Sequence, residues 1–90
     1  MLNLQRVTMF IAVVDAGSFT LAAAALGQTK AVVSFNVRQL ENELGVTLLL
    51  RSTRRLRLTD AGALFYQRGV ALLKAAENLQ DEVRSEEHTS

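Results

Sequence analysis

Cysteine is absent from this 90-residue chain, and histidine occurs only once, as His88 near the end of the sequence. Without cysteine there are no disulfides and no thiolate metal sites, and the composition is compatible with a reducing compartment. A Gly-rich phosphate loop is also missing, and the carboxylates Glu41, Glu43 and Asp60 are expected at solvent-facing helix positions or at a helix cap. We therefore expect that the protein is not an enzyme and that it holds no metal or cofactor.

Long apolar runs are missing too. The longest, Met9 to Val14 and Leu21 to Leu26, are far shorter than the roughly 20 residues that a membrane-spanning helix requires. The first residues lack the basic start, apolar stretch and cleavage site of a secretory signal. The chain has the size of one small domain with a single core, and we expect it to be soluble and cytoplasmic, with no membrane contact.

The formal net charge of +1 conceals an uneven distribution. Residues 1–76 carry nine cations and four anions, whereas residues 77–90 carry five anions and a single cation. Four of the cations, Arg51, Arg54, Arg55 and Arg57, fall within seven residues. Because like charges at this spacing repel one another, a polyanionic partner is the economical explanation. The alternative is an ordinary solvated loop.

Three helices are expected in the first half of the chain, each with a polar N-cap and a terminating glycine. The first follows Asn3 and ends at Gly17, the second spans 19–26 between Ser18 and Gly27, and the third runs from Thr29 to Gly45. The second and third together form a helix, a short turn and a helix within about thirty residues. A protein needs this arrangement to lay a helix in a DNA groove.

The third helix has two different sides. Its apolar stripe consists of Val33, Val37, Leu40 and Leu44, which recur at helical spacing. Its outward side carries Lys30, Ala31, Ser34, Phe35, Arg38 and Asn42. Serine and arginine suit base edges and phosphates, and a phenyl ring or an alanine methyl can pack on a thymine methyl.

Alternatives remain for this outward side. A solvated helix face explains Lys30 and Arg38 equally well, and Phe35 can fold back onto Val32 or onto the following hairpin. Thr29 is better explained as a cap than as a base reader, although the helix start can bind a phosphate in either case.

After Gly45 the apolar period changes. Residues 46–50 form a short apolar run, residues 52–55 are a polar turn candidate, and residues 56–58 alternate as a strand does. This pattern predicts a small antiparallel hairpin with an arginine-rich tip.

A long last helix is predicted to begin at Thr59 and Asp60, with the hydroxyl as cap and the carboxylate near the positive end of the helix dipole. Leu64 and Leu73 form a stripe expected to hold the helix to the domain. A separate heptad seam consists of Phe65, Gly69, Leu72, Ala76, Leu79 and Val83.

We expect a homodimer through this seam, the alternative being packing along the helix's own domain. A two-fold pair presents two recognition helices to two half-sites about one helical turn, or a multiple, apart. Residues 85–90 show no periodicity and are expected to be a disordered tail without function.

Several separated motifs resemble one known family. They are the run from Phe10 to Thr20, the segment 22–26, Ser34 followed by residues 38–46, and Arg51 followed by residues 58–62. In this order and spacing they closely resemble the N-terminal DNA-binding domain of LysR-type transcriptional regulators. The resemblance covers about residues 2–83.

The resemblance implies a mainly α fold: a winged helix-turn-helix with a three-helix core and a two-stranded wing over residues 1–59, then a linker and dimerisation helix over 60–84. It further implies bacterial transcription regulation by sequence-specific binding of double-stranded DNA at interrupted palindromes. The helix-turn-helix positions that match are Ser18, Thr29, Lys30, Ala31, Ser34 and Arg38, and the wing positions are Arg51, Arg54 and Arg55; the outward side adds Phe35.

The chain departs from the family pattern at two positions of the third helix. Ala31 stands where the family often has proline, and Phe35 stands where it often has a basic or polar residue. The family's C-terminal inducer-binding domain is absent from this sequence, so no small-molecule inducer is expected to bind it. The alternative function is a helical protein-interaction module without specific DNA binding.

Overall fold

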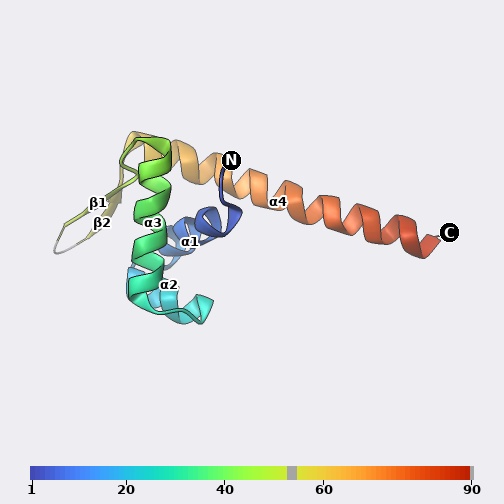
Figure 1. Ribbon diagram of the computed structural model, residues 1–90, viewed down its shortest axis with the longest axis horizontal. Coiled ribbons are helices and arrows are strands. Elements are labelled where there is room, and N and C mark those ends of the chain that lie inside the picture. The colour runs from blue at the N-terminus through green and yellow to red at the C-terminus, as the bar shows by residue number, and fades with distance from the viewer. Residues whose placement is uncertain (53–54, 90) are drawn as a thin grey trace.

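The computed structural model describes residues 1–52 and 55–89, and three helices pack together at one end of it (Figure 1). These are α1 (Leu4–Ala16), α2 (Phe19–Leu26) and α3 (Lys30–Leu44). A ribbon of β1 (Leu49–Arg51) and β2 (Leu56–Leu58) projects from them, and α4 (Asp60–Thr89) extends away on the other side. The predicted three-helix core, two-stranded wing and long last helix are confirmed.

The ends of the first three helices are set by local chemistry, as predicted. Ser18 Oγ accepts a hydrogen bond from the Leu21 N–H at 3.0 Å, and Thr29 Oγ1 accepts one from the Val32 N–H at 3.2 Å. Asn3 caps α1 in the same way. Each helix ends at a glycine with a positive φ, which a residue with a side chain adopts only at a cost.

The core lies where the three helices meet the base of the wing. Its buried side chains are Val7, Phe10, Ile11, Val13, Ala22, Ala23, Val33, Val37, Leu40, Leu48 and Leu49. The predicted stripe of α3 is therefore confirmed except for Leu44, which is 38% exposed. Leu44 is the last residue of α3, where it lies beside Met1 and Leu2 instead of beneath α1 and α2.

The wing is a single antiparallel pair, with Leu49 opposite Leu58 and Arg51 opposite Leu56. At its end, Ser52 Oγ accepts from the Arg55 N–H at 3.1 Å and donates to the Arg55 carbonyl at 2.9 Å. The predicted hairpin is confirmed, with strands of three residues each. Arg54, one of the predicted wing cations, lies outside the described residues.

The start of α4 is fastened to the base of the wing. Thr59 Oγ1 accepts from the Gly62 N–H at 2.9 Å, as a helix cap does, and donates to the Thr47 carbonyl at 2.6 Å. Gly62 is buried against Leu48, and a Cβ at this position would lie 2.0 Å from the Leu48 carbonyl oxygen. A side chain at residue 62 would therefore separate α4 from the wing.

The first turns of α4 pack on α1. The Phe65 ring meets the Phe10 ring edge to face at 5.5 Å between centroids. A Cβ at Gly69 would lie 3.2 Å from a methyl of Val7, so the two helices are close there. Leu73 is partly buried against the core, as predicted, but Leu64 is 55% exposed. The prediction for Leu64 was wrong because residues 65, 69 and 73 form the face that docks. Phe65 and Gly69, which were expected in the dimer seam, are used by this contact with α1 instead.

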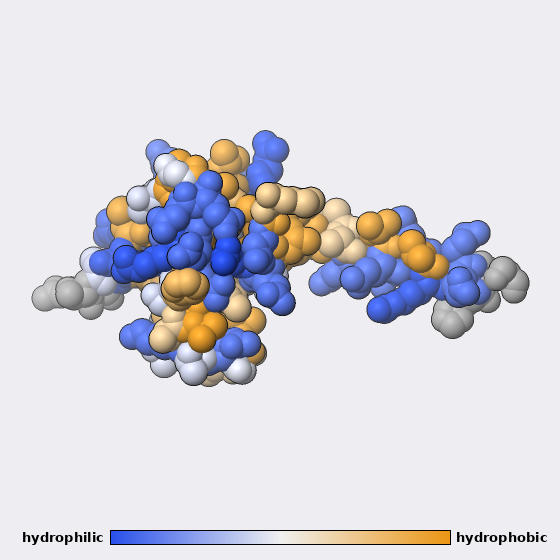
Figure 2. All heavy atoms as spheres, viewed as in Figure 1, coloured by the Kyte–Doolittle hydropathy of each residue, from blue (hydrophilic) through white to orange (hydrophobic). Residues whose placement is uncertain are grey.

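Beyond this contact α4 projects from the body of the molecule. The seam residues Leu72, Leu79 and Val83 are exposed there, and Figure 2 shows hydrophobic side chains along the projecting helix. α4 continues to Thr89, five residues beyond the expected end at residue 84, where a disordered tail was expected. Within the described residues, no helix is long and apolar enough to cross a membrane.

Candidate nucleic-acid interface

The outward side of α3 is open to solvent along its first half. Lys30, Ala31, Phe35 and Arg38 are exposed there, and Ser34 is half-buried between them. Phe35 is 57% exposed, so it does not fold back onto Val32 or the wing. The structure thus brings a line of cationic, hydroxyl and aromatic side chains onto one accessible helix face.

The hydroxyls of Ser18 and Thr29 are already used within the chain. Each accepts a hydrogen bond from a backbone N–H in the first turn of its helix. These hydroxyls are therefore not free to bind DNA. Their predicted contribution to the interface is to cap the N-termini of α2 and α3, because such termini attract phosphate. Lys30 follows Thr29 directly and adds a positive charge at the start of α3.

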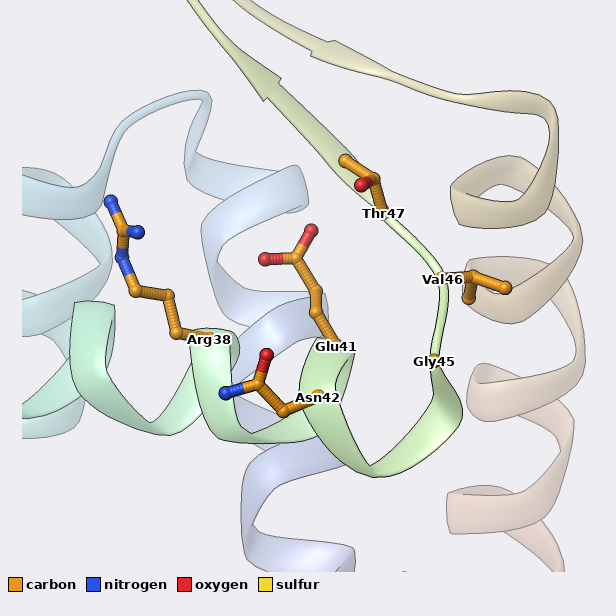
Figure 3. A pocket seen from close by; sticks show the side chains of 6 residues that line it. All are labelled: Arg38, Glu41, Asn42, Gly45, Val46 and Thr47. Carbon is orange, nitrogen blue, oxygen red and sulfur yellow. The ribbon is translucent and has the colours of Figure 1, made fainter.

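Glu41 links α3 to the base of the wing. Its carboxylate accepts hydrogen bonds from the Leu48 N–H at 2.7 Å and the Leu49 N–H at 3.2 Å, and it lies 3.5 Å from the guanidinium of Arg51. Figure 3 shows the Glu41 side chain pointing from α3 toward the segment that leads into β1. The expectation that Glu41 faces solvent was wrong, since its side chain is only 14% exposed.

Arg51 is enclosed rather than presented at the wing tip. Its guanidinium lies 5.1 Å from the centre of the Phe19 ring, and the Nε atom is buried without a hydrogen-bond partner among the described residues. Burial lowers the pKa of Arg51, Glu41 acts against this, and nearby Arg38 adds a smaller lowering. Arg51 remains charged, because arginine does not deprotonate in proteins.

The prediction grouped Arg51 with the phosphate-binding arginines of the wing, whereas the structure places its side chain between Phe19 of α2 and Glu41 of α3. The alternation of buried and exposed residues along β1 is the sequence signal that distinguishes Arg51 from the exposed arginines of the wing. Leu49 is buried, Leu50 is exposed, and Arg51 points to the same face as Leu49. Arg55 and Arg57 are both exposed, and with Leu50 and Ser52 they line a hollow of about 440 Å³.

A second hollow lies between the end of α3 and the base of the wing. It has a volume of about 390 Å³ and is lined by Arg38, Glu41, Asn42, Gly45, Val46 and Thr47 (Figure 3). Its only carboxylate is engaged with backbone amides and Arg51. No group of three metal-ligating side chains occurs in the described part of the chain.

α3 is also fixed against α1. The Arg6 guanidinium pairs with the Glu43 carboxylate, and Arg6 Nε donates to Asn36 Oδ1 at 3.2 Å. The Asn36 amide nitrogen in turn donates to the Val32 carbonyl at 2.8 Å. These contacts join the inner edge of α3 to the scaffold, so its outward face is presented by a fixed helix.

Three packed helices, an accessible second helix of the helix-turn-helix and a basic wing define a winged helix-turn-helix domain. Residues 4–63 match the sequence model described as bacterial regulatory helix-turn-helix protein, lysR family, and the chain belongs to that family.

Two curated relatives are transcriptional regulators. The chain is 43% identical over 82 residues to a probable HTH-type transcriptional regulator, LtrA, of Klebsiella pneumoniae, an alignment that covers 91% of this chain and 26% of the relative. It is 50% identical over 70 residues to the HTH-type transcriptional regulator PtxR of Pseudomonas aeruginosa, covering 78% and 22%. The chain thus spans about a quarter of the length of these relatives.

Solved structures of DNA complexes are similar to this fold. The BenM DNA-binding domain with catB site 1 DNA has a TM-score of 0.89 and 34% identity, covering 92% of this chain and 93% of that one. The CbnR DNA-binding domain with DNA has the same score and identity, covering 92% and 95%. A helical protein-interaction module is not favoured by these similarities.

Proposed function

We propose that this chain binds double-stranded DNA sequence-specifically and thereby regulates transcription, with α3 in the major groove and the wing beside the backbone. The observation that carries the proposal is the open outward face of α3, where Lys30, Ser34, Phe35 and Arg38 lie on a helix fixed to the scaffold. The similarity to DNA-binding domains that were solved in complex with DNA supports DNA binding by this chain.

Each group at the interface has a chemical task. Lys30 and Arg38 contact phosphates or guanine, and Ser34 donates to a base edge or a phosphate. The N-termini of α2 and α3, capped by Ser18 and Thr29, attract phosphates through their dipoles. The exposed Arg55 contacts the backbone from the wing, and Arg57, exposed on the same ribbon, adds a positive charge there. Arg54 belongs to the same proposal by its place in the sequence.

The binding unit is a homodimer that forms through α4. Leu72, Leu79 and Val83 are exposed on the projecting helix, and Ala76 between them is half-buried. A second copy covers these apolar side chains, and the two-fold axis sets the spacing of two half-sites. In this arrangement residues 1–59 read DNA and residues 60–84 hold the two copies together.

The proposal includes no catalysis, no cofactor and a place in the bacterial cytoplasm, where promoter DNA is found. The inducer-binding function of longer family members is not assigned to this chain.

A gel-shift titration at several salt concentrations tests the proposal. We expect affinity for random-sequence DNA to fall with salt, with a log-log slope of about −0.9 per neutralised phosphate. Replacing Arg55 with Ala should weaken all sequences alike and flatten the slope by about one phosphate. The double replacement of Ser34 and Phe35 by Ala should reduce sequence preference instead. Absence of any shift at low salt would defeat the proposal.

A further inference from the structure

An apolar strip runs along the part of α3 proposed to face DNA. It consists of Ala31, Val32 and Phe35. Val32 lies three residues before Phe35 and Ala31 four residues before it, so both are neighbours of Phe35 on the helix surface. All three are exposed, although the rest of the outward face is polar. The Phe35 ring is exposed on a face that the fold leaves open. Covering this ring with an apolar partner lowers the free energy of the system.

The side-chain amide of Asn36, the residue after Phe35, is bonded within the protein. Asparagine is the residue type that reads adenine, but Asn36 donates to the Val32 carbonyl at 2.8 Å and accepts from Arg6 Nε at 3.2 Å. The first of these bonds lies within α3, and the second holds α3 to α1. Between the exposed cations Lys30 and Arg38, the side chains that remain for base contact are therefore those of Ser34 and Phe35, beside Ala31.

The charges that flank the strip define its partner. Lys30 and Arg38 are exposed at its two ends, so the matching surface is anionic at the edges and has an apolar group between them. The major groove has this form: phosphates border it, and the C5-methyl of thymine is the one apolar group that a base pair presents there.

We propose that Phe35, with Ala31 beside it, contacts the C5-methyl group of one thymine in each half-site. This inference rests on the proposed function and assigns the discrimination at that base pair to an apolar contact instead of a hydrogen bond. 5-Methylcytosine carries its methyl group at the same ring position, so it replaces the thymine better than cytosine does.

The test removes the methyl group and nothing else. A binding site is first selected from a random pool with the unaltered chain, and each thymine of both half-sites is then replaced in turn by deoxyuridine. At one position per half-site, affinity should fall about fourfold, the factor that corresponds to about 0.8 kcal/mol for one buried methyl-sized group. The Phe35→Ala variant should bind the thymine and deoxyuridine sites equally, and Phe35→Leu should retain most of the difference.

Leu44→Ala is the matched control. Leu44 lies at the other end of the same helix and is 38% exposed, so this variant should keep the full deoxyuridine effect. Thermal unfolding of each variant verifies that the fold is intact, which is expected because Phe35 is on the surface.

The outcomes separate the two proposals. If no sequence is enriched from the pool, the proposed function itself fails. If a site is enriched but no thymine methyl contributes to affinity, or if Phe35→Ala keeps the deoxyuridine penalty, the inference about Phe35 is overturned and DNA binding stands. Recovery of affinity by 5-methylcytosine, but not by cytosine, at the sensitive position supports it.

Discussion

The side chain of Glu41 connects α3 to the base of the wing. Its carboxylate satisfies two backbone N–H groups of the segment that leads into β1 and also faces the Arg51 guanidinium. Arg51 then extends the contact to the ring of Phe19 at the start of α2. α2, α3 and β1 thus meet through the side chains of Phe19, Glu41 and Arg51.

Replacing Glu41 by Ala should destabilise the domain by about 1–3 kcal/mol, because partly buried donors lose their acceptor. Glu41→Gln keeps an acceptor oxygen and should cost less. Denaturant unfolding measures both values. Glu77→Ala, at an exposed position of α4, is the control and should lie within about 0.5 kcal/mol of the original chain. Equal stability of the Glu41→Ala and Glu77→Ala variants would contradict the structural role of Glu41.

Tyr66 gives a prediction on pH. Its hydroxyl donates to Asp15 at 2.5 Å, and this hydrogen bond, then burial, then the charge of Asp15 raise the pKa of Tyr66 above its ordinary value. The hydrogen bond therefore stabilises the folded state fully at a pH below the pKa of unfolded tyrosine, about 10. This stabilisation is lost as the pH rises through the pKa of Tyr66 in the folded chain.

The chain contains one tyrosine, so tyrosinate absorbance reports this titration directly. We expect its midpoint in the folded chain to lie above that in denaturant. The unfolding free energy of Tyr66→Phe should depend less on pH in the alkaline range than that of the original chain. A midpoint that is unchanged by unfolding would exclude the link to Asp15.

At the scale of elements, the helices are predictable where local chemistry sets them. The caps at Ser18 and Thr29 and the glycines that end α2 and α3 act within a few residues, so the sequence alone locates them. The rotation of α4 was not predictable in this way. Its periodicity shows an apolar face, but the α1 side chains that cover its first turns come from a segment distant in sequence.

The same limit applies to the candidate site. The outward face of α3 follows from helical periodicity, whereas the enclosure of Arg51 depends on Glu41 and Phe19, which come from two other elements. The four neighbouring arginines look equivalent in the sequence, and the alternation of β1 and the position of α2 distinguish Arg51 from the exposed Arg55 and Arg57.

The junction of the wing and α4 depends on the lack of a side chain at residue 62. Gly62→Ala should destabilise the domain by at least about 1–3 kcal/mol, because its Cβ would meet a backbone carbonyl at 2.0 Å and backbone must move. Ala63→Ser adds one heavy atom at the next, exposed position and should have little effect. Thermal unfolding compares the stability of the two variants. A Gly62→Ala variant as stable as Ala63→Ser would refute the close packing of Gly62 on Leu48.

At the scale of the whole molecule, the long axis of 55 Å reflects a helix that leaves its own domain. The first turns of α4 are used by α1, and the later part of the same apolar face is uncovered, with Leu79 and Val83 each 61% exposed. A monomer leaves these side chains in water, and the proposed second copy of the helix would bury them.

Leu79→Glu should therefore shift the chain from dimer to monomer without loss of helix content. Gln80→Glu adds the same charge a hundred degrees around the helix and should leave the dimer intact. Sedimentation equilibrium gives the mass of each, and circular dichroism verifies the helix. A Leu79→Glu variant that remains as dimeric as Gln80→Glu would place the interface elsewhere.

The proposed role of α3 is to read a DNA sequence as one half of a two-fold pair. Random-site selection followed by sequencing tests it most directly, because it reports the half-site and its spacing together. We expect enrichment of inverted half-sites whose centres are about one helical turn, or a multiple of it, apart. A pool that stays random after repeated selection at low salt would contradict it.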